Sequence, residues 1–197
     1  MNYNNEMEKI LKSLDHTPNI LIHSCCGPCS TSVITRLKDY FNITVLYYNP
    51  NIEPFIEYEK RKEEQKKVLT LIKSNNKLDF LDCDYDNDLY HEKVKGLEHT
   101  KEGGPRCKVC YHLRLSYTKE KAKDKGFDYF TTTLSVSPFK NASWINEIGL
   151  SLEDDKVKFL PADFKKKDGY KKSIELSNKY NLYRQNYCGC IYSKVDN

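Results

Sequence analysis

Short apolar segments alternate with amphipathic helical segments along this chain of 197 residues, and the alternation restricts the fold more than any other feature. Five apolar segments have the length of β-strands: 19–24, 43–49, 78–83, 129–134 and 157–160. Between them apolar residues recur at helical spacing, as at Val33, Ile34 and Leu37. Strands that alternate with helices predict an open, mostly parallel α/β sheet of five strands with helices on both faces.

Further helices are expected around Val68 and over residues 108–125, and Pro28 and Pro54 stand where a first helical position would fall. The chain contains no internal repeat and no linker rich in Pro or Gly. Its length suits one hydrophobic core, since single cores are usual up to ~250 residues. We therefore expect one α/β domain over residues 1–197 with a C-terminal Cys-x-Cys extension.

The composition excludes several classes of protein. No apolar run approaches the ~20 residues of a membrane-spanning helix, and residues 1–8 lack the hydrophobic stretch of a signal peptide. We therefore expect a cytoplasmic protein with no membrane partner. The net charge of +4 permits contact with nucleic acid without requiring it.

Cysteine is the residue type that points most clearly to chemistry. Seven of the eight cysteines fall in three clusters: Cys25, Cys26 and Cys29; Cys107 and Cys110; Cys188 and Cys190. Cys83 stands alone. Without a secretory signal, metal or redox chemistry is favoured over a framework of structural disulfides.

The first cluster falls where such sheets build their sites. If the strand order is 3-2-1-4-5, the first and fourth strands are neighbours at the switch point, and ligands bind beyond the carboxyl ends of the strands there. Cys25 and Cys26 directly follow the first strand, and residues 131–135 end the fourth. We expect these cysteines to open into that crevice.

The first two clusters suit a metal. Adjacent cysteines such as Cys25 and Cys26 point in different directions, so they suit two corners of a larger cluster better than one small tetrahedral ion. Cys107 and Cys110 form a C-x-x-C at an expected helix start. Two distant C-x-x-C units can bind structural zinc or an iron–sulfur cluster, and the spacing favours iron–sulfur only slightly.

The third cluster is Cys188-Gly189-Cys190. A disulfide across one intervening residue is hard to form without strain, and strained disulfides tend to be catalytic or labile. The pair is therefore a candidate redox pair, with two further metal ligands as the alternative.

Other candidates are weaker. Asp84 follows the third strand and is a plausible acid or ligand. Asp163 opens the basic stretch 163–170, which is either a loop that contacts phosphate or a solvated loop. His23 is expected to be a packed histidine. Neither G-x-G-x-x-G nor G-x-x-x-x-G-K-[ST] occurs, which disfavours a dinucleotide-binding fold or a P-loop nucleotidase.

Taken together, these segments resemble the cobalamin-independent epoxyqueuosine reductases, a family of tRNA-modifying enzymes. The matching blocks run from Ile20 to Cys190 and are HSCCGPCS, EGGPRCKVCYHLRL, FDYFTTTLSVSPFKN, ADFKKKDGYKKSIELS and YNLYRQNYCGC. The resemblance implies a Rossmann-like domain of the nucleotide-hydrolase and PP-loop-like group. It also implies a tRNA substrate with epoxyqueuosine at the wobble position, reduced to queuosine with an external electron donor.

The resemblance assigns roles to particular residues. Cys25, Cys26, Cys107 and Cys110 would hold a [4Fe-4S] cluster, and Cys188 and Cys190 would form the redox-active pair. A second iron is an option, with Asp84 or Asp163 as its candidate ligand or as the proton donor, and no cobalamin is expected. A positive mouth should receive the anticodon loop, with these candidates: Arg106, Arg114, Arg184 and Lys165 to Lys167.

Two other functions compete with this one. A zinc-stabilised tRNA-binding module would use the same cysteines without catalysis. A PP-loop-type, ATP-dependent tRNA-modifying enzyme would need a Ser-Gly-Gly loop after the first strand, where this chain has Cys25 and Cys26.

Overall fold

The structure is a computed structural model, and it describes residues 2–194. One sheet contains five strands: β1 (Asn19–His23), β2 (Asn42–Leu46), β3 (Leu78–Leu81), β4 (Tyr129–Thr132) and β5 (Lys158–Phe159). Every pair of neighbouring strands is parallel, and the order is β3-β2-β1-β4-β5. The expected α/β class with a parallel five-stranded sheet is therefore confirmed, and the order is the one assumed above for the position of the site. The narrower PP-loop-like group remains a prediction.

The strands end earlier than the sequence predicts, and the difference lies at the edge that carries the site. The fourth strand was expected to reach Leu134 but ends at Thr132, and residues Thr133–Val136 form a 3₁₀ turn, η1. The Thr132 hydroxyl accepts a hydrogen bond from the amide of Leu134 at 3.1 Å. A hydroxyl that bonds a nearby amide competes with the sheet for that amide, so the strand stops there.

Helices fill the connections between the strands. They are α1 (Tyr3–Ser13), α2 (Gly27–Leu37), α3 (Phe55–Leu71), α4 (Asn87–Val94), α5 (Pro105–Asp124), α6 (Ala142–Leu152) and α7 (Gly169–Lys179), with a short 3₁₀ turn η2 (Ile191–Ser193) near the C-terminus. Pro28 lies in the first turn of α2, as expected, and Pro54 lies directly before α3. The helix expected over 108–125 begins earlier, at Pro105.

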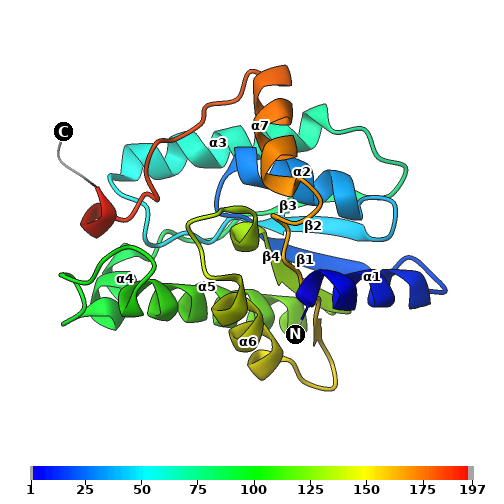
Figure 1. The fold of residues 1–197 in the computed structure, drawn as a ribbon, viewed down its shortest axis with the longest axis horizontal. Helices are drawn as coiled ribbons and strands as arrows, with labels where there is room; N and C mark the ends of the chain where they lie inside the picture. The colour runs from blue at the N-terminus through cyan, green and yellow to red at the C-terminus, as the bar shows by residue number, and fades with distance from the viewer. Residues whose placement is uncertain (1, 195–197) are drawn as a thin grey trace.

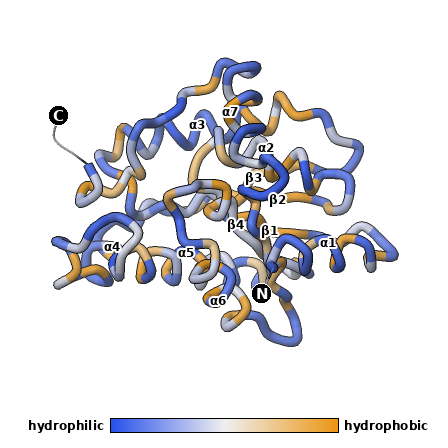
Figure 2. Tube along the Cα trace, in the orientation of Figure 1, coloured by the Kyte–Doolittle hydropathy of each residue, from blue (hydrophilic) through white to orange (hydrophobic). Residues whose placement is uncertain are grey.

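The helices cover both faces of the sheet, as expected for this class. Figure 1 shows α2, α3 and α7 on one side and α4, α5 and α6 on the other. Successive residues of β1 point to opposite faces: Ile20 and Ile22 belong to one buried cluster with Val68 of α3, and Leu21 belongs to another with Leu115 of α5. Along α1, Figure 2 shows apolar residues interspersed with polar ones, and Met7 and Leu11 of this helix belong to the first buried cluster, the pattern of a helix that buries one side.

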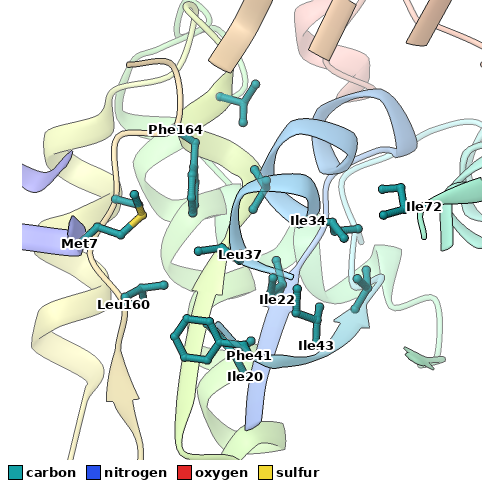
Figure 3. Close-up of a cluster of buried hydrophobic side chains, with 14 of the residues drawn as sticks. Met7, Ile20, Ile22, Ile34, Leu37, Phe41, Ile43, Ile72, Leu160 and Phe164 are labelled. Carbon is teal, nitrogen blue, oxygen red and sulfur yellow. The ribbon is translucent and has the colours of Figure 1, made fainter. Parts of the chain in front are cut away.

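The larger of these clusters anchors the segment that leads to the site. Ile22 of β1 packs with Ile34 and Leu37 of α2, and all three side chains are fully buried (Figure 3). Phe164 and Leu160 join the same cluster from the chain after β5. The loop between β1 and α2 is therefore held at both ends by the core. No helix of residues 2–194 combines the length and apolar composition needed to cross a membrane.

The contact between α6 and β5 provides a test of the packing. A Cβ at Gly149 of α6 would overlap the buried ring of Phe159. Gly149→Ala should therefore lower the free energy of unfolding by about 1–3 kcal/mol, the usual cost of overpacking. Denaturant unfolding measures this, and Phe159→Leu in the same chain should recover part of the loss as a favourable coupling energy. Ser143→Ala, at an exposed site on α6, is the control; a gain in stability for Gly149→Ala would show that the Phe159 ring gives way.

Candidate active site

The loop between β1 and α2 places the first cysteine cluster at the switch point. Cys25 and Cys26 follow β1, whose neighbours are β2 and β4, and Cys26 is the residue that precedes the first turn of α2. Helix α2 lies so close to α3 that a Cβ at Gly27 would sit 2.9 Å from the carbonyl oxygen of Glu64. Glycine is therefore required there for the helix to start directly after the cysteines. The free amides of that first turn favour thiolates nearby.

Three thiols converge in this loop. The sulfur atoms of Cys25, Cys26 and Cys29 all lie within 4.8 Å of one another, and those of Cys25 and Cys26 are 3.9 Å apart. The expectation that the adjacent Cys25 and Cys26 point apart is wrong here, because the chain turns from the end of β1 into α2 at these two residues. Among residues 2–194, this is the one grouping of three or more Cys, His, Asp and Glu side chains tight enough to hold a metal ion.

The three thiols differ in acidity. Hydrogen bonds from Cys26, Cys29 and Thr133 lower the pKa of Cys25 well below its usual value. The thiol of Cys26 keeps its proton beside that thiolate, which raises its pKa to about 12, and the pKa of Cys29 is raised for the same reason. The hydroxyl of Thr133, the first residue of η1 directly after β4, also accepts a hydrogen bond from the amide of Cys25, at 3.2 Å. The loop is thus built to carry negative charge on Cys25.

A pocket of about 840 Å³ opens at this place, and Cys188 from the far end of the chain lines it together with Cys25, Cys26 and Cys29. Its charged lining residues are four cations and one carboxylate: Arg114, Lys140, Arg184, Lys194 and Glu102. The pocket therefore combines four thiols with a positive lining.

Lys140 lies at the centre of the charges. Its ammonium donates to the Cys188 sulfur at 3.2 Å, and its side chain is only 8% exposed. Burial alone would lower the pKa of Lys140, but the thiol groups, Cys188 foremost, raise it above its usual value. Arg114 of α5 is also buried and bonds Asn49 at 3.3 Å. Both cations therefore keep their charge and favour thiolates around them.

Cys107 and Cys110 occupy the first turns of α5, as the sequence predicts for a C-x-x-C at a helix start. Both are buried, and burial raises the pKa of Cys107 and that of Cys110 to about 11. Neither belongs to the three-thiol group or lines the pocket. Cys188 and Lys140 are near enough to influence the pKa of Cys107 and that of Cys110. Cys25 packs against the apolar cluster that contains Cys107. The second C-x-x-C thus lies behind the pocket wall, on the Cys188 side.

The two cysteines of the C-terminal pair have different surroundings. Cys188 lines the pocket, whereas Cys190 is 4% exposed and packs in an apolar cluster with Tyr90, Val94 and Cys110. The Tyr90 hydroxyl lies 3.0 Å from the Cys190 sulfur. All eight cysteines are unbridged.

Helix α3 and the segment before it hold the C-terminal turn by its main chain. The guanidinium of Arg61, which is 1% exposed, donates to the carbonyl oxygens of Tyr187 at 3.4 Å and Cys188 at 3.1 Å. The amide of Glu53 donates to the carbonyl of Gly189 at 2.9 Å. Three consecutive carbonyls of the turn are therefore fixed, and Cys188 is held at the pocket independently of its own side chain.

The two predicted acids lie elsewhere. Asp84 is exposed and lines a second pocket with Cys83, while Asp163 forms an ion pair with Lys165 at 3.0 Å. Neither lines the thiol pocket. His23 is fully buried and hydrogen-bonded to Thr132 and Tyr48, as expected of a packed histidine.

Two of the cations predicted for the pocket mouth are instead buried. Arg106 is 1% exposed because it bonds main-chain carbonyls, Glu98 among them, and Arg114 is 2% exposed. Among the predicted cations, Arg184 and the buried Arg114 line the pocket. Lys140 and Arg61 were not predicted from the sequence, and Cys29 was predicted as a ligand only in the zinc alternative, as part of the C-x-x-C of Cys26 and Cys29. Of these three residues, only Cys29 had a signal in the sequence: it follows Cys26 by three residues across the start of a helix, a spacing that brings two thiols together.

The fold and the site define a class: an α/β protein with a polythiol site at the switch point of a parallel sheet. Comparison with known proteins identifies the family within this class. Residues 20–196 match the family model "Epoxyqueuosine reductase QueH". A protein of that name from Streptococcus pyogenes serotype M1 is 41% identical over 191 residues, covering 95% of this chain and 75% of its own length.

Two further relatives carry the same name. The one from Staphylococcus epidermidis is 38% identical and covers 99% of this chain and 85% of its own length. The one from Thermotoga maritima is 36% identical and covers 90% of this chain and 91% of its own length. The chain belongs to the epoxyqueuosine reductase QueH family, a family of oxidoreductases, which confirms the resemblance seen in the sequence.

The hold of α3 on the C-terminal turn can be tested at Gly189. Gly189 has a φ of +100°, and a Cβ there would lie 2.8 Å from Arg61 Nη1 and 2.8 Å from Ile52 Cγ1. Gly189→Ala should therefore displace the turn and expose Cys190. In reduced, metal-free protein we expect alkylation of Cys190, followed by peptide mass spectrometry, to be roughly tenfold faster, the effect of ~1.4 kcal/mol.

Gly126→Ala is the matched control, because Gly126 also has a positive φ, +70°, but a Cβ there meets nothing within 4 Å. Both variants carry the backbone strain of a side chain in this region. Equal alkylation rates in the two variants would show that Arg61 does not hold the turn.

Proposed function

We propose that this chain reduces epoxyqueuosine to queuosine at the wobble position of tRNA, the last step of queuosine biosynthesis, in the cytoplasm. The observation that carries the proposal is the convergence of Cys25, Cys26, Cys29 and Cys188, from opposite ends of the chain, on one positively lined pocket. Membership of the QueH family supplies the substrate class, because its relatives are named for that reaction.

The residues present fit an iron–sulfur cofactor. Thiolates are the ligands of such clusters, and the loop around Cys25 is arranged to carry thiolate charge. The hydroxyl of Tyr111, next to Cys110, is buried and has no hydrogen-bond partner among residues 2–194. A buried hydroxyl without a partner is rare, so it favours a bound group beside α5.

In this proposal Cys25, Cys26, Cys107 and Cys110 hold a [4Fe-4S] cluster, which supplies electrons when bound. Cys29, which the structure brings to Cys25 and Cys26, offers a third thiol for a second iron. The predicted role of Asp84 or Asp163 as its ligand, or as the proton donor, receives no support from their positions outside the pocket.

The reaction consumes two electrons and two protons. Both C–O bonds of the epoxide break, a C=C bond forms and the oxygen leaves as water. Oxidation of the thiols of Cys188 and Cys190 to a disulfide releases two electrons and two protons, so the pair can balance one turnover. An external electron donor then returns the pair to the dithiol.

The two cysteines have unequal tasks. Cys188 faces the pocket and the Lys140 ammonium, so it is the thiol that meets substrate. Cys190 is buried behind it and completes the disulfide. Lys140, a buried cation at the pocket wall, stabilises the negative charge that develops on the epoxide oxygen.

The pocket also suits the substrate's form. A base within a stacked anticodon loop is out of reach of a recessed site, so enzymes that act on a base draw it out of the stack. The cations of the pocket favour the polyanionic loop around that base.

Cysteine variants test the division of labour. Cys107→Ala should lose iron and turnover together, because it removes a cluster ligand. Cys188→Ala should keep the iron–sulfur absorbance but lose turnover on epoxyqueuosine-containing tRNA. Cys83→Ala, in the other pocket, is the control and should keep both. If Cys188→Ala also strips the iron, the C-terminal pair are ligands; if the wild type binds RNA but never forms product, the protein is a binding module.

A second test concerns the buried ammonium. Lys140→Met should lower kcat by about 10²–10³-fold, the effect of removing one oxyanion-stabilising donor, when it is assayed at saturating RNA in protein reconstituted to the wild-type iron content. Lys140→Arg should retain more activity than Lys140→Met. Lys101→Met, at an exposed position, is the control. A full kcat for Lys140→Met in a steady-state assay would remove Lys140 from the mechanism.

A further inference from the structure

The thiol pocket contains one aromatic side chain whose ring is left uncovered. Three aromatic residues line the pocket: Phe139, Tyr170 and Tyr187. Arg184 lies over the ring of Tyr170 at 5.5 Å, and Arg61 lies over that of Tyr187 at 4.9 Å. Phe139 is 74% exposed, and no cation or aromatic ring of residues 2–194 stacks on it.

The backbone holds Phe139 outward in a fixed turn. The amide of Phe139 donates to the hydroxyl of Ser137 at 3.3 Å, and the side chain of Asn141 caps α6 by accepting the amide of Trp144 at 3.1 Å. The next residue, Lys140, points inward to the Cys188 sulfur. The same short segment therefore places a cation beside the thiols and an apolar ring at the pocket mouth.

The charges around the ring indicate what binds there. The thiol pocket has four cations and one carboxylate in its lining. The second pocket has the opposite balance, with Glu59, Asp82 and Asp84 against Lys62, and it too has an exposed phenylalanine, Phe55, which is 55% exposed. A polyanion with flat apolar groups fits the first pocket and is repelled by the second.

We propose that Phe139 is the platform on which an unstacked base of the tRNA anticodon loop stacks when the wobble nucleotide enters the pocket. This inference rests on the proposed function and extends it to a recognition residue. Single-stranded RNA is recognised in this way, by bases that leave the helical stack and lie on aromatic side chains. Every base has a flat face, so the contact adds affinity at the pocket mouth without reading sequence.

The test measures the Kd of a synthetic anticodon stem-loop RNA for the iron-loaded protein over a series of salt concentrations. Phe139→Ala should weaken binding about 5- to 150-fold, the loss of ~1–3 kcal/mol from one stacked base. Phe139→Trp should bind as the wild type or more tightly. Phe55→Ala, which removes the exposed ring at the acidic pocket, is the matched control and should leave Kd unchanged.

The salt dependence separates stacking from damage to the cationic surface. Loss of a stacked base removes no phosphate contact, so the slope of log K against log salt should be the same for Phe139→Ala and the wild type. The iron content and thermal unfolding of Phe139→Ala should also match the wild type, because the ring is largely exposed.

Three outcomes overturn the inference. Phe139→Ala with an unchanged Kd excludes stacking, and so does Phe139→Trp with the same loss as Phe139→Ala. Unchanged RNA affinity with slower turnover only in the presence of a protein electron donor would make Phe139 a contact for that donor. If the wild type also neither binds the stem-loop nor acts on epoxyqueuosine-containing tRNA, the proposed function fails as well. If one of these outcomes occurs while the wild type does both, only the role of Phe139 is rejected.

Discussion

The site depends on two buried cations among buried thiols. Arg114 and Lys140 are both removed from water, and such charges are stable only where opposite charge is close. Cys25, whose pKa is lowered, supplies part of that charge as a thiolate, and the carboxylate of Glu102 lies 3.9 Å from the Lys140 ammonium. The buried cations and the negative charges beside them therefore stabilise each other. The thiols of the pocket thus have a positive environment in the protein alone, without a bound metal.

The parallel sheet makes this arrangement possible. The order β3-β2-β1-β4-β5 sets the ends of β1 and β4 side by side, so Cys25 meets Thr133 across the switch point. The chain after α7 then returns along α3 to deliver Cys188 to the same place (Figure 1). Thiols far apart in the sequence therefore reach one pocket. The sheet positions Cys25 at the end of β1, and Arg61 positions Cys188 through its main chain.

The sequence was sufficient to predict a parallel α/β sheet and the position of Cys25 and Cys26 directly after its first strand, because hydrophobic periodicity determines both. The strand order that places them at the switch point was an assumption, and the structure has that order. It was less informative about tertiary contacts. Arg106 and Arg114 were predicted to be surface cations, yet each is buried by bonds to oxygens distant in the sequence: Arg106 donates to the carbonyl of Tyr192 and Arg114 to the side-chain oxygen of Asn49. Lys140 could not be told from the many other lysines, because its partner Cys188 is 48 residues away.

The central claim is that these sequence-distant thiols hold iron for a reduction. The most direct test is the iron, zinc and acid-labile sulfide content of wild-type protein purified without oxygen. We predict acid-labile sulfide equivalent to one [4Fe-4S] cluster per chain and at least as much iron, and we assign any iron in excess of the sulfide to a second iron at Cys29. Stoichiometric zinc without sulfide would contradict the account.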